Sequence, residues 1–345
     1  AQQKEIARLM EIVEKFKNKP TKVAMTRSKL KQIEHMEKIA PPQRYDLKAF
    51  HANFQPEVET GKEVFTARNL QIGYDRVLSE VNLTLERGQK LGIVGGNGLG
   101  KSTFLKTMMG MIQPLGGEYQ YGIRVQIGYF DQQMAHYTSD ATVMDDYWAE
   151  YPNLTQTEVR NALGAFLFTG DDVFKQVSML SGGERVRLAL CKILKKKPNL
   201  LILDEPTAGL DVIARNEVLD LLREYMEIPG RSMLISSHVA TDLENLCDDL
   251  YLIDRGRIRM HETIDALHDE YAVLTLTDDQ MSAADPRYIL VKQRTAGGWK
   301  AITDERGFYE ENLPGVGICG ASIDEIITLM SADPRTTTMQ ERTMQ

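Results

Sequence analysis

The chain has little cysteine, little tryptophan and no long apolar run in its 345 residues. Its three cysteines, Cys191, Cys247 and Cys319, are scattered, which argues against a disulfide framework or a clustered zinc site and favours inert, buried thiols in a reducing compartment. No segment approaches the roughly 18 uninterrupted apolar residues that span a bilayer, and the first residues lack the apolar stretch of a signal peptide. We therefore expect a cytoplasmic protein with no direct membrane insertion, which reaches a membrane only through a partner.

Acidic residues outnumber basic ones in this chain, except at the N-terminus. The net charge is −8, yet residues 1–40 hold ten Lys or Arg against five Glu, so residues 41–345 carry −13. Apolar residues recur at heptad spacing on both sides of Pro20, which predicts a helical hairpin with a lysine-rich turn. Such a hairpin is either a solvated strut or a basic tip that attracts phosphates, with an affinity that falls as salt rises.

A complete P-loop pattern follows the short apolar run at residues 90–94, which is predicted to be a buried strand. Glycines in this pattern allow successive backbone N–H groups to turn toward an anion at the start of a helix. The lysine is expected to reach the β- and γ-phosphates of a nucleoside triphosphate, and the serine hydroxyl to bind Mg²⁺. The predicted nucleotide-binding residues are Gly95, Gly96, Asn97, Gly98, Leu99, Gly100, Lys101, Ser102 and Thr103.

Two further motifs narrow the class of nucleotide-binding protein. The first is Ser181, Gly182, Gly183 and Glu184, which taken alone could be an ordinary helix N-cap. The second is the apolar run at 200–203 that ends in Asp204 and Glu205, as expected for a central parallel strand with acids at its carboxyl edge. We predict that Asp204 holds Mg²⁺ and that Glu205 polarises the attacking water.

In this order, the motifs at residues 63–260 resemble the nucleotide-binding domain of ABC ATPases. The resemblance implies that Tyr74 stacks on adenine, that Gln132 senses Mg²⁺ and the attacking water, and that His238 contacts the γ-phosphate. It also implies that Asp211 lies in a loop that crosses a dimer interface. Considered alone, Tyr74 would be a turn aromatic, Gln132 a surface amide and His238 a strand-end cap.

The same resemblance implies that the active site is shared between two domains. In this family the segment Ser181–Glu184 contacts the nucleotide held by the opposite domain. The chain has one P-loop and one such segment. We therefore expect ATP and Mg²⁺ as cofactors and a second nucleotide-binding domain as partner, in a homodimer or on a separate chain.

The two halves of the chain resemble different branches of the family. Residues 1–206 resemble the interdomain linker and second ATPase domain of ABC-F proteins, which implies that residues 1–40 reach the ribosome and tRNA. Residues 207–345 resemble the ATPase subunit of an ABC-2-type exporter, which implies a membrane permease as the alternative partner. We interpret the chain as a mosaic joined near residues 201–207. Because residues 133–178 resemble ABC-F proteins, the groove that an exporter subunit needs near Gln132 is predicted to be missing.

The predicted fold class is α/β: a P-loop NTPase of the ABC ATPase type with antiparallel β and helical subdomains, an N-terminal α-hairpin and a small C-terminal α+β appendage. Helices are expected over 140–178 and 322–330, and strands over 288–291 and 299–302. The predicted divisions are a hairpin at 1–40, a connecting segment at 41–62, the nucleotide-binding domain at 63–262, the small α+β domain at 263–333 and a disordered tail at 334–345.

Overall fold

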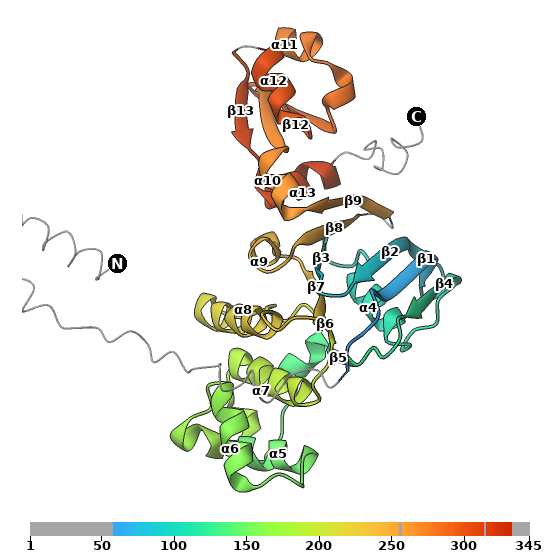
Figure 1. The fold of residues 1–345 in the computed structure, drawn as a ribbon. Coiled ribbons are helices and arrows are strands. Elements are labelled where there is room, and N and C mark those ends of the chain that lie inside the picture. The colour runs from blue at the N-terminus through green and yellow to red at the C-terminus, as the bar shows by residue number, and fades with distance from the viewer. Residues whose placement is uncertain (1–57, 255–256, 314, 333–345) are drawn as a thin grey trace, which may run out of the picture. The chain divides into compact units, whose positions relative to one another are not determined.

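The computed structural model describes residues 58–254, 257–313 and 315–332. The predicted hairpin at 1–40 and the predicted disordered tail at 334–345 lie outside these residues. A mixed nine-stranded sheet forms the centre of the described chain, in the order β4-β1-β2-β9-β8-β3-β7-β6-β5 (Figure 1). Its strands are β1 (Glu63–Gly73), β2 (Val77–Glu86), β3 (Lys90–Val94), β4 (Gly116–Tyr121), β5 (Ile127–Phe130), β6 (Leu200–Asp204), β7 (Ser232–Ser237), β8 (Asp249–Asp254) and β9 (Arg257–Thr263).

The strands β5, β6, β7, β3 and β8 are parallel and form the part of the sheet that carries the predicted motifs. Every residue of β6 and β7 is buried. Parallel strands covered on both faces require such continuous apolar runs, as at residues 200–203. Because the strands are parallel, their carboxyl ends lie at one edge, and Asp204 is registered beside Ser236 there.

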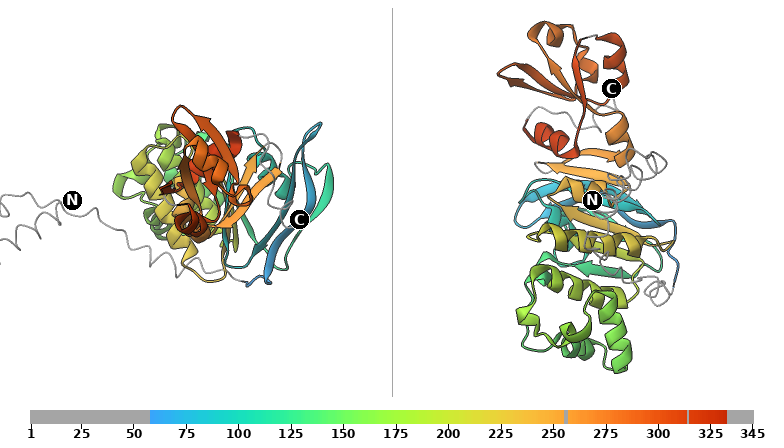
Figure 2. Two further views of the ribbon diagram at one scale, coloured as in Figure 1. Left: turned by 90° about the horizontal axis from the view of Figure 1, so that it is seen from above. Right: turned by 90° about the vertical axis from the view of Figure 1, so that its left-hand side faces the viewer.

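The strands β1, β2 and β4 are antiparallel and pack over the helix α4 (Lys101–Met108). Phe104 and Leu105 of this helix share one apolar core with Phe65, Leu70 and Ile72 of β1. The antiparallel strands join the rest of the sheet by pairing between β2 and β9, at Glu80 and Arg257. The sheet therefore curls around α4 and fixes the helix that begins at the P-loop (Figure 2).

Helices and 3-10 turns fill most of the segment between β5 and β6. The predicted helical stretch at 140–178 contains two α-helices and two 3-10 turns, and the longer α7 follows it. These elements are η2 (Gln132–His136), α5 (Val143–Glu150), α6 (Gln156–Ala165), η3 (Gly170–Phe174), η4 (Val177–Met179) and α7 (Gly182–Lys195). The helices α8 (Val212–Met226) and α9 (Ala240–Glu244) then separate β6, β7 and β8.

A second, four-stranded antiparallel sheet lies beyond β9, in the order β11-β12-β10-β13. Its elements are α10 (Ile264–Asp269), β10 (Ala272–Leu276), α11 (Asp278–Ala283), η5 (Pro286–Tyr288), β11 (Val291–Thr295), β12 (Gly298–Thr303), α12 (Arg306–Asn312), β13 (Gly317–Gly320) and α13 (Ile323–Ala332). The strand predicted at 288–291 is wrong except for Val291. Pro286 fixes its own φ, and the Asp285 side chain accepts from the N–H of Arg287, so the chain forms a 3-10 turn there.

The structure corrects one further expectation. Cys191 and Cys247 are buried as predicted, but Cys319 is exposed because it lies on β13 at the edge of the small sheet. Burial raises the pKa of the Cys191 and Cys247 thiols, which keeps them protonated. Among the described residues, no helix has the length and apolar character needed to cross a bilayer.

Candidate functional site

The P-loop connects β3 directly to α4, as its sequence predicts. Gly95 has no room for a side chain, because a Cβ there would lie 2.3 Å from the carbonyl oxygen of Ile253 on β8. Gly98 and Gly100 have φ values of 77° and 103°, in the left-handed region that glycine tolerates best. Gly100 is the N-cap of α4, so the loop ends at the helix terminus that attracts anions.

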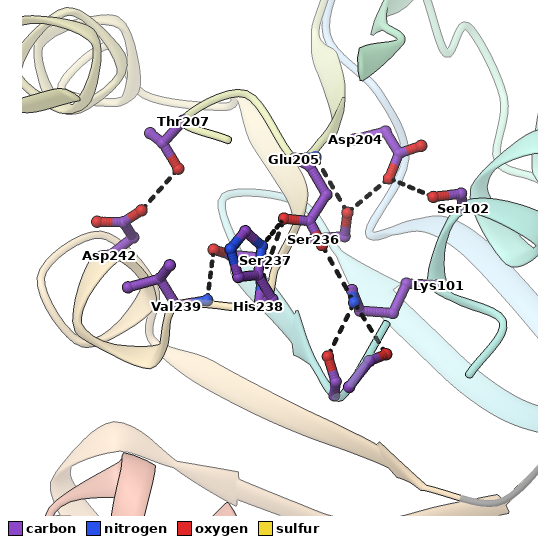
Figure 3. A network of polar contacts seen from close by, with 12 residues as sticks. Lys101, Ser102, Asp204, Glu205, Thr207, Ser236, Ser237, His238, Val239 and Asp242 are labelled. Atoms are coloured by element: carbon purple, nitrogen blue, oxygen red, sulfur yellow. Dashed lines mark hydrogen bonds and ion pairs between the residues drawn. The ribbon is translucent and has the colours of Figure 1, made fainter. Parts of the chain in front are cut away.

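Lys101 is buried at the base of this loop. Its Nζ donates to the carbonyl oxygens of Gly95 at 2.8 Å and Gly96 at 3.3 Å. It also lies 3.1 Å from Oε1 of Glu205, in an ion pair whose two side chains are 5% and 7% exposed. The lysine therefore places its charge between the loop and the acidic end of β6 (Figure 3).

Asp204 and Ser102 form a pair of oxygen donors beside the lysine. The Ser102 hydroxyl donates to Oδ1 of Asp204 at 3.0 Å, and the Ser236 hydroxyl donates to the same oxygen at 2.8 Å. Burial raises the pKa of Asp204, and the nearby Asp131 and Glu205 add to this effect, while the two serine bonds oppose it. A carboxylate and a hydroxyl at this spacing are hard oxygen ligands, so these residues fit Mg²⁺.

Glu205 lies between Lys101 and His238. Its Oε2 accepts hydrogen bonds from the backbone N–H of His238 at 3.2 Å and pairs with Nδ1 of the same residue. Burial alone would raise the pKa of Glu205, but the bond to His238 and the charge of Lys101 outweigh it and lower the pKa. The carboxylate is therefore held in its charged, proton-accepting form.

A cavity of about 300 Å³ brings the three predicted catalytic residues together with part of the P-loop. Gln132, Glu205 and His238 line it opposite the P-loop, although they are far apart in the sequence. The complete lining is Asn97, Gly98, Gly100, Lys101, Ser102, Thr103, Gln132, Glu205 and His238. A triphosphate bound in this cavity would lie close to Lys101, the P-loop, Glu205 and His238.

Several predicted residues do not line this cavity: Tyr74, Gly95, Gly96, Leu99, Asp204, the segment Ser181–Glu184 and Asp211. Tyr74 is 61% exposed, in the turn between β1 and β2. Asp211 caps α8, because its side chain accepts from the N–H groups of Ile213 and Ala214. The segment Ser181–Glu184 lies at the start of α7. None of its residues lines the cavity of the same chain.

The segment Ser181–Glu184 forms a capping box. The Ser181 hydroxyl accepts from the N–H of Glu184 at 3.3 Å, and the Glu184 carboxylate accepts from the N–H of Ser181 at 2.8 Å. The ordinary N-cap interpretation is therefore part of the structure. Ser181 and Gly182 nevertheless remain exposed, and a Cβ on Gly183 would lie 2.5 Å from that of Ala214, so α7 and α8 begin side by side.

Sequence reasoning missed two contributions to this region. Ser236 holds Asp204, although a serine at a strand end gives no signal of its own. Thr207 bonds to Asp242 at 2.6 Å across 35 residues of sequence, and Asp242 also pairs with Arg215. The contacts of Ser236 with Asp204 and of Thr207 with Asp242 could be predicted only from the pairing of β6 with β7.

Comparison with known proteins identifies the fold and the family. Residues 78–208 match a family model described as "ABC transporter", and residues 1–51 match a second model with the same description. The solved structure of cbiO1 from Clostridium perfringens, part of an ABC transporter complex, has a TM-score of 0.52 and 26% identity, covering 59% of this chain and 90% of that one. A dimeric ATP-binding cassette bound to ADP and Pi has a TM-score of 0.51 and 19% identity, covering 58% and 98%.

Two relatives are similar over longer segments. The protein named "Putative ATP-binding protein YdiF" of Bacillus subtilis is 39% identical over 273 residues, which cover 78% of this chain and 40% of that protein. The ATP-binding protein Uup of Haemophilus influenzae is 38% identical over 216 residues, which cover 61% and 33%. The chain thus spans less than half the length of these two relatives. Residues 78–208 therefore form an ABC ATPase domain, and the P-loop, Asp204 and Glu205 lie within it.

Proposed function

We propose that this chain binds Mg-ATP in the 300 Å³ cavity and hydrolyses it as one half of a head-to-tail pair of nucleotide-binding domains. The observation that carries the proposal is the position of Glu205. It is a buried carboxylate held in charged form between Lys101 and His238, at the wall of a cavity that the P-loop lines. A charged carboxylate in this place suits a group that orients water for attack on a phosphate.

The chemistry follows from where negative charge develops. Phosphoryl transfer spreads charge over the oxygens of the γ-phosphate, so Lys101 and the N–H groups of the P-loop stabilise the transition state. Glu205 orients the attacking water and accepts its proton, and His238 contacts the phosphate from the opposite wall. Ser102, Asp204 and Gln132 would hold Mg²⁺, which neutralises phosphate charge when bound. Tyr74 is proposed to stack on adenine at the edge of the site.

The need for a second domain is supported by what the cavity lacks. Ser181 and its neighbours line no part of it, yet they are exposed beside the start of α8. Val212 and Ile213, directly after Asp211, are 72% and 73% exposed, and Met179 just before the segment is 75% exposed. We propose that this apolar surface, together with Ser181–Glu184 and Asp211, meets the nucleotide held by the partner domain.

The main functional proposal is an ABC-F-like ATPase that acts on ribosomes in the cytoplasm. The family model at residues 1–51 and the similarity to YdiF and Uup support it. The basic residues of segment 1–40 would contact ribosomal or transfer RNA phosphates, and this contact would weaken steeply as salt rises. The alignment with YdiF is longer than the 206 residues before the predicted mosaic junction, so similarity to this relative continues past that junction.

A membrane exporter subunit is the second candidate, and one observation favours it. A cavity of about 750 Å³ lies beside η2, between β5 and α7, with Tyr129, Met134 and Leu188 in its lining. This cavity lies near the position where an exporter subunit needs its groove. A hollow surface at this place could receive a helix of a permease.

The variant Glu205→Gln can be used to separate these candidates. It keeps the side-chain volume but cannot accept the proton, so the chain should stay in its ATP-bound state. We expect it to bind Mg-ATP and to hydrolyse it at least about 100-fold more slowly than the parent chain. The trapped variant is then sedimented from a lysate with ATP, and its distribution between ribosomes and membranes is measured.

Recovery with ribosomes supports the ABC-F proposal, and recovery with membranes supports the exporter alternative. Deletion of residues 15–31 is expected to abolish ribosome recovery and to leave ATP binding intact. Calorimetry of the folded chain with Mg-ATP tests the common part of both candidates, because an absence of binding heat would contradict each of them.

A further inference from the structure

Asp242 is an almost completely buried carboxylate that the proposed chemistry does not use. It lies on α9 and is 2% exposed. Its Oδ2 accepts from the Thr207 hydroxyl at 2.6 Å, and its Oδ1 accepts from Nε of Arg215 at 2.5 Å (Figure 3 shows the bond to Thr207). A buried carboxylate is retained only when charged and hydrogen-bonded partners compensate for its loss of water, so this contact holds its segments in a fixed geometry.

The three residues belong to three segments that border the ATP site. Thr207 lies two residues after Glu205, in a turn closed by a hydrogen bond from the N–H of Ala208 to the carbonyl of Glu205. Asp242 lies four residues after His238, on the helix that follows it. Arg215 is the fourth residue of α8, the helix that Asp211 caps.

Besides the bonds of Asp204 and Glu205 to Ser236, two contacts connect the end of β6 with the residues that follow β7. The first is the direct contact between Glu205 and His238, inside the cavity. The second is the bond between Thr207 and Asp242, outside it. Glu205 itself has a φ of 50°, in the left-handed region that is unfavourable for a residue with a side chain, so its turn needs an external support.

We propose that Asp242 is a positioning residue for ATP hydrolysis. By holding Thr207 and Arg215 at once, it sets the orientation of Glu205 relative to His238 and ties both to α8, where the loop of Asp211 faces the partner domain. This inference rests on the proposed ATPase function and assigns to Asp242, Thr207 and Arg215 a role that their residue types alone do not indicate.

A second link between the same helices provides a matched control. Nε of Arg223, two turns further along α8, donates to the carbonyl oxygen of Asn245 at 3.2 Å. This bond docks α8 against the residue after α9 but does not touch Thr207 or Asp242. If the contacts of Asp242 only docked two helices, loss of the Arg223 bond would have the same effect on hydrolysis.

The experiment measures steady-state ATP hydrolysis by the full chain and the variants Asp242→Asn, Thr207→Val and Arg223→Met. Thr207→Val is nearly isosteric and leaves the ion pair between Asp242 and Arg215 intact, so the fold is retained. We expect kcat to fall about tenfold or more in the first two variants, because a small misplacement of a catalytic group is costly, while KM for ATP changes much less. Arg223→Met should keep the parent kcat.

Rescue and stability measurements exclude a general loss of fold. Thr207→Ser restores the hydroxyl and should recover most of the rate that Thr207→Val loses, at an equal midpoint of thermal unfolding. Parent-like kcat in both Asp242→Asn and Thr207→Val would overturn the inference while the ATPase proposal stands. An equal loss in Arg223→Met would also overturn it. If the parent chain binds Mg-ATP but does not hydrolyse it, the proposed hydrolysis is wrong, and this inference is overturned with it.

Discussion

At the scale of single residues, the ion pair between Lys101 and Glu205 decides how the site tolerates substitution. Both side chains are buried, so each charge depends on the other to offset its lost hydration. The same two groups are the ones that the proposed mechanism uses, on the phosphate and on the water. Function and stability are therefore coupled at this pair.

The variant Lys101→Met is expected to destabilise the fold by about 3 kcal/mol, because it leaves the buried Glu205 carboxylate with its bonds to His238 but without its lysine partner. The double variant Lys101→Met with Glu205→Gln should recover much of that loss, since it removes both charges. Urea unfolding of the parent, the two single variants and the double variant measures this coupling.

A surface pair provides the control for this prediction. Lys62 lies 3.3 Å from Glu86, but these side chains are 81% and 49% exposed. Lys62→Met should change the free energy of unfolding by less than about 1 kcal/mol. Equal effects of Lys62→Met and Lys101→Met would contradict the role given to burial.

At the scale of elements, the start of α7 combines a helix cap with the segment proposed to reach the partner's nucleotide. The reciprocal bonds between Ser181 and Glu184 satisfy N–H groups that the helix leaves free. Lys175 lies 3.3 Å from the Glu184 carboxylate and adds its charge to the cap. The conformation of the segment is therefore set within one chain before a partner arrives.

The pKa of Glu184 gives this cap a predictable pH dependence. Partial burial alone would raise the pKa, but hydrogen bonds with Ser181 and the charge of Lys175 outweigh it and lower the pKa below 4.5. A lowered carboxyl pKa stabilises the fold above pH 4.5, and the effect is lost as pH falls through the pKa of the folded state. Glu184→Gln should cost about 1 kcal/mol or less at pH 7, because solvent screens the charge, and the difference should shrink below pH 4.5.

Chemical denaturation of the parent and of Glu184→Gln at several pH values between 7 and 4 checks this expectation. A stability difference that does not vary with pH would show that the charge of Glu184 contributes nothing to the cap.

The parts of the site that sequence could predict are those with a local physical signal. The P-loop is contiguous, and its glycines are required by positive φ and by the approach of Ile253 to Gly95. Asp204 and Glu205 directly follow a buried apolar run. Thr207 and Asp242 carry no such signal, since they meet only when β6 and β7 pair. The fold class followed from alternating elements, whereas the strand expected before Val291 failed because Pro286 starts a 3-10 turn.

At the scale of the whole molecule, the exposed apolar side chains of Val212 and Ile213 belong to the surface proposed to meet the partner domain. A single charged residue here should block the proposed pairing of domains without disturbing the fold, because neither side chain belongs to the core. Ile213→Asp is expected to abolish the rise of specific ATPase activity with protein concentration and to leave ATP binding intact.

Ile123 offers a matched control, because it is also 72% exposed but lies after β4, away from α8. Sedimentation velocity with ATP, in the Glu205→Gln background, should show a dimer for Ile123→Asp and a monomer for Ile213→Asp. Dimers in both variants would place the partner surface elsewhere.

The curled sheet has one further consequence for the molecule as a whole. Among the described residues, the antiparallel strands join the parallel ones through the single paired position of Glu80 and Arg257. Strand pairing is thus sparse along this seam in the described part of the chain, where residues of α4 share one apolar core with β1 and with Leu91 and Ile93 of β3. Native-state amide exchange should reveal two cooperative units, one on each side of the seam. The strands that carry Tyr74 and the loop that carries Lys101 would then unfold locally with separate free energies. A mutation could therefore weaken binding of the purine ring and leave binding of its phosphates unchanged.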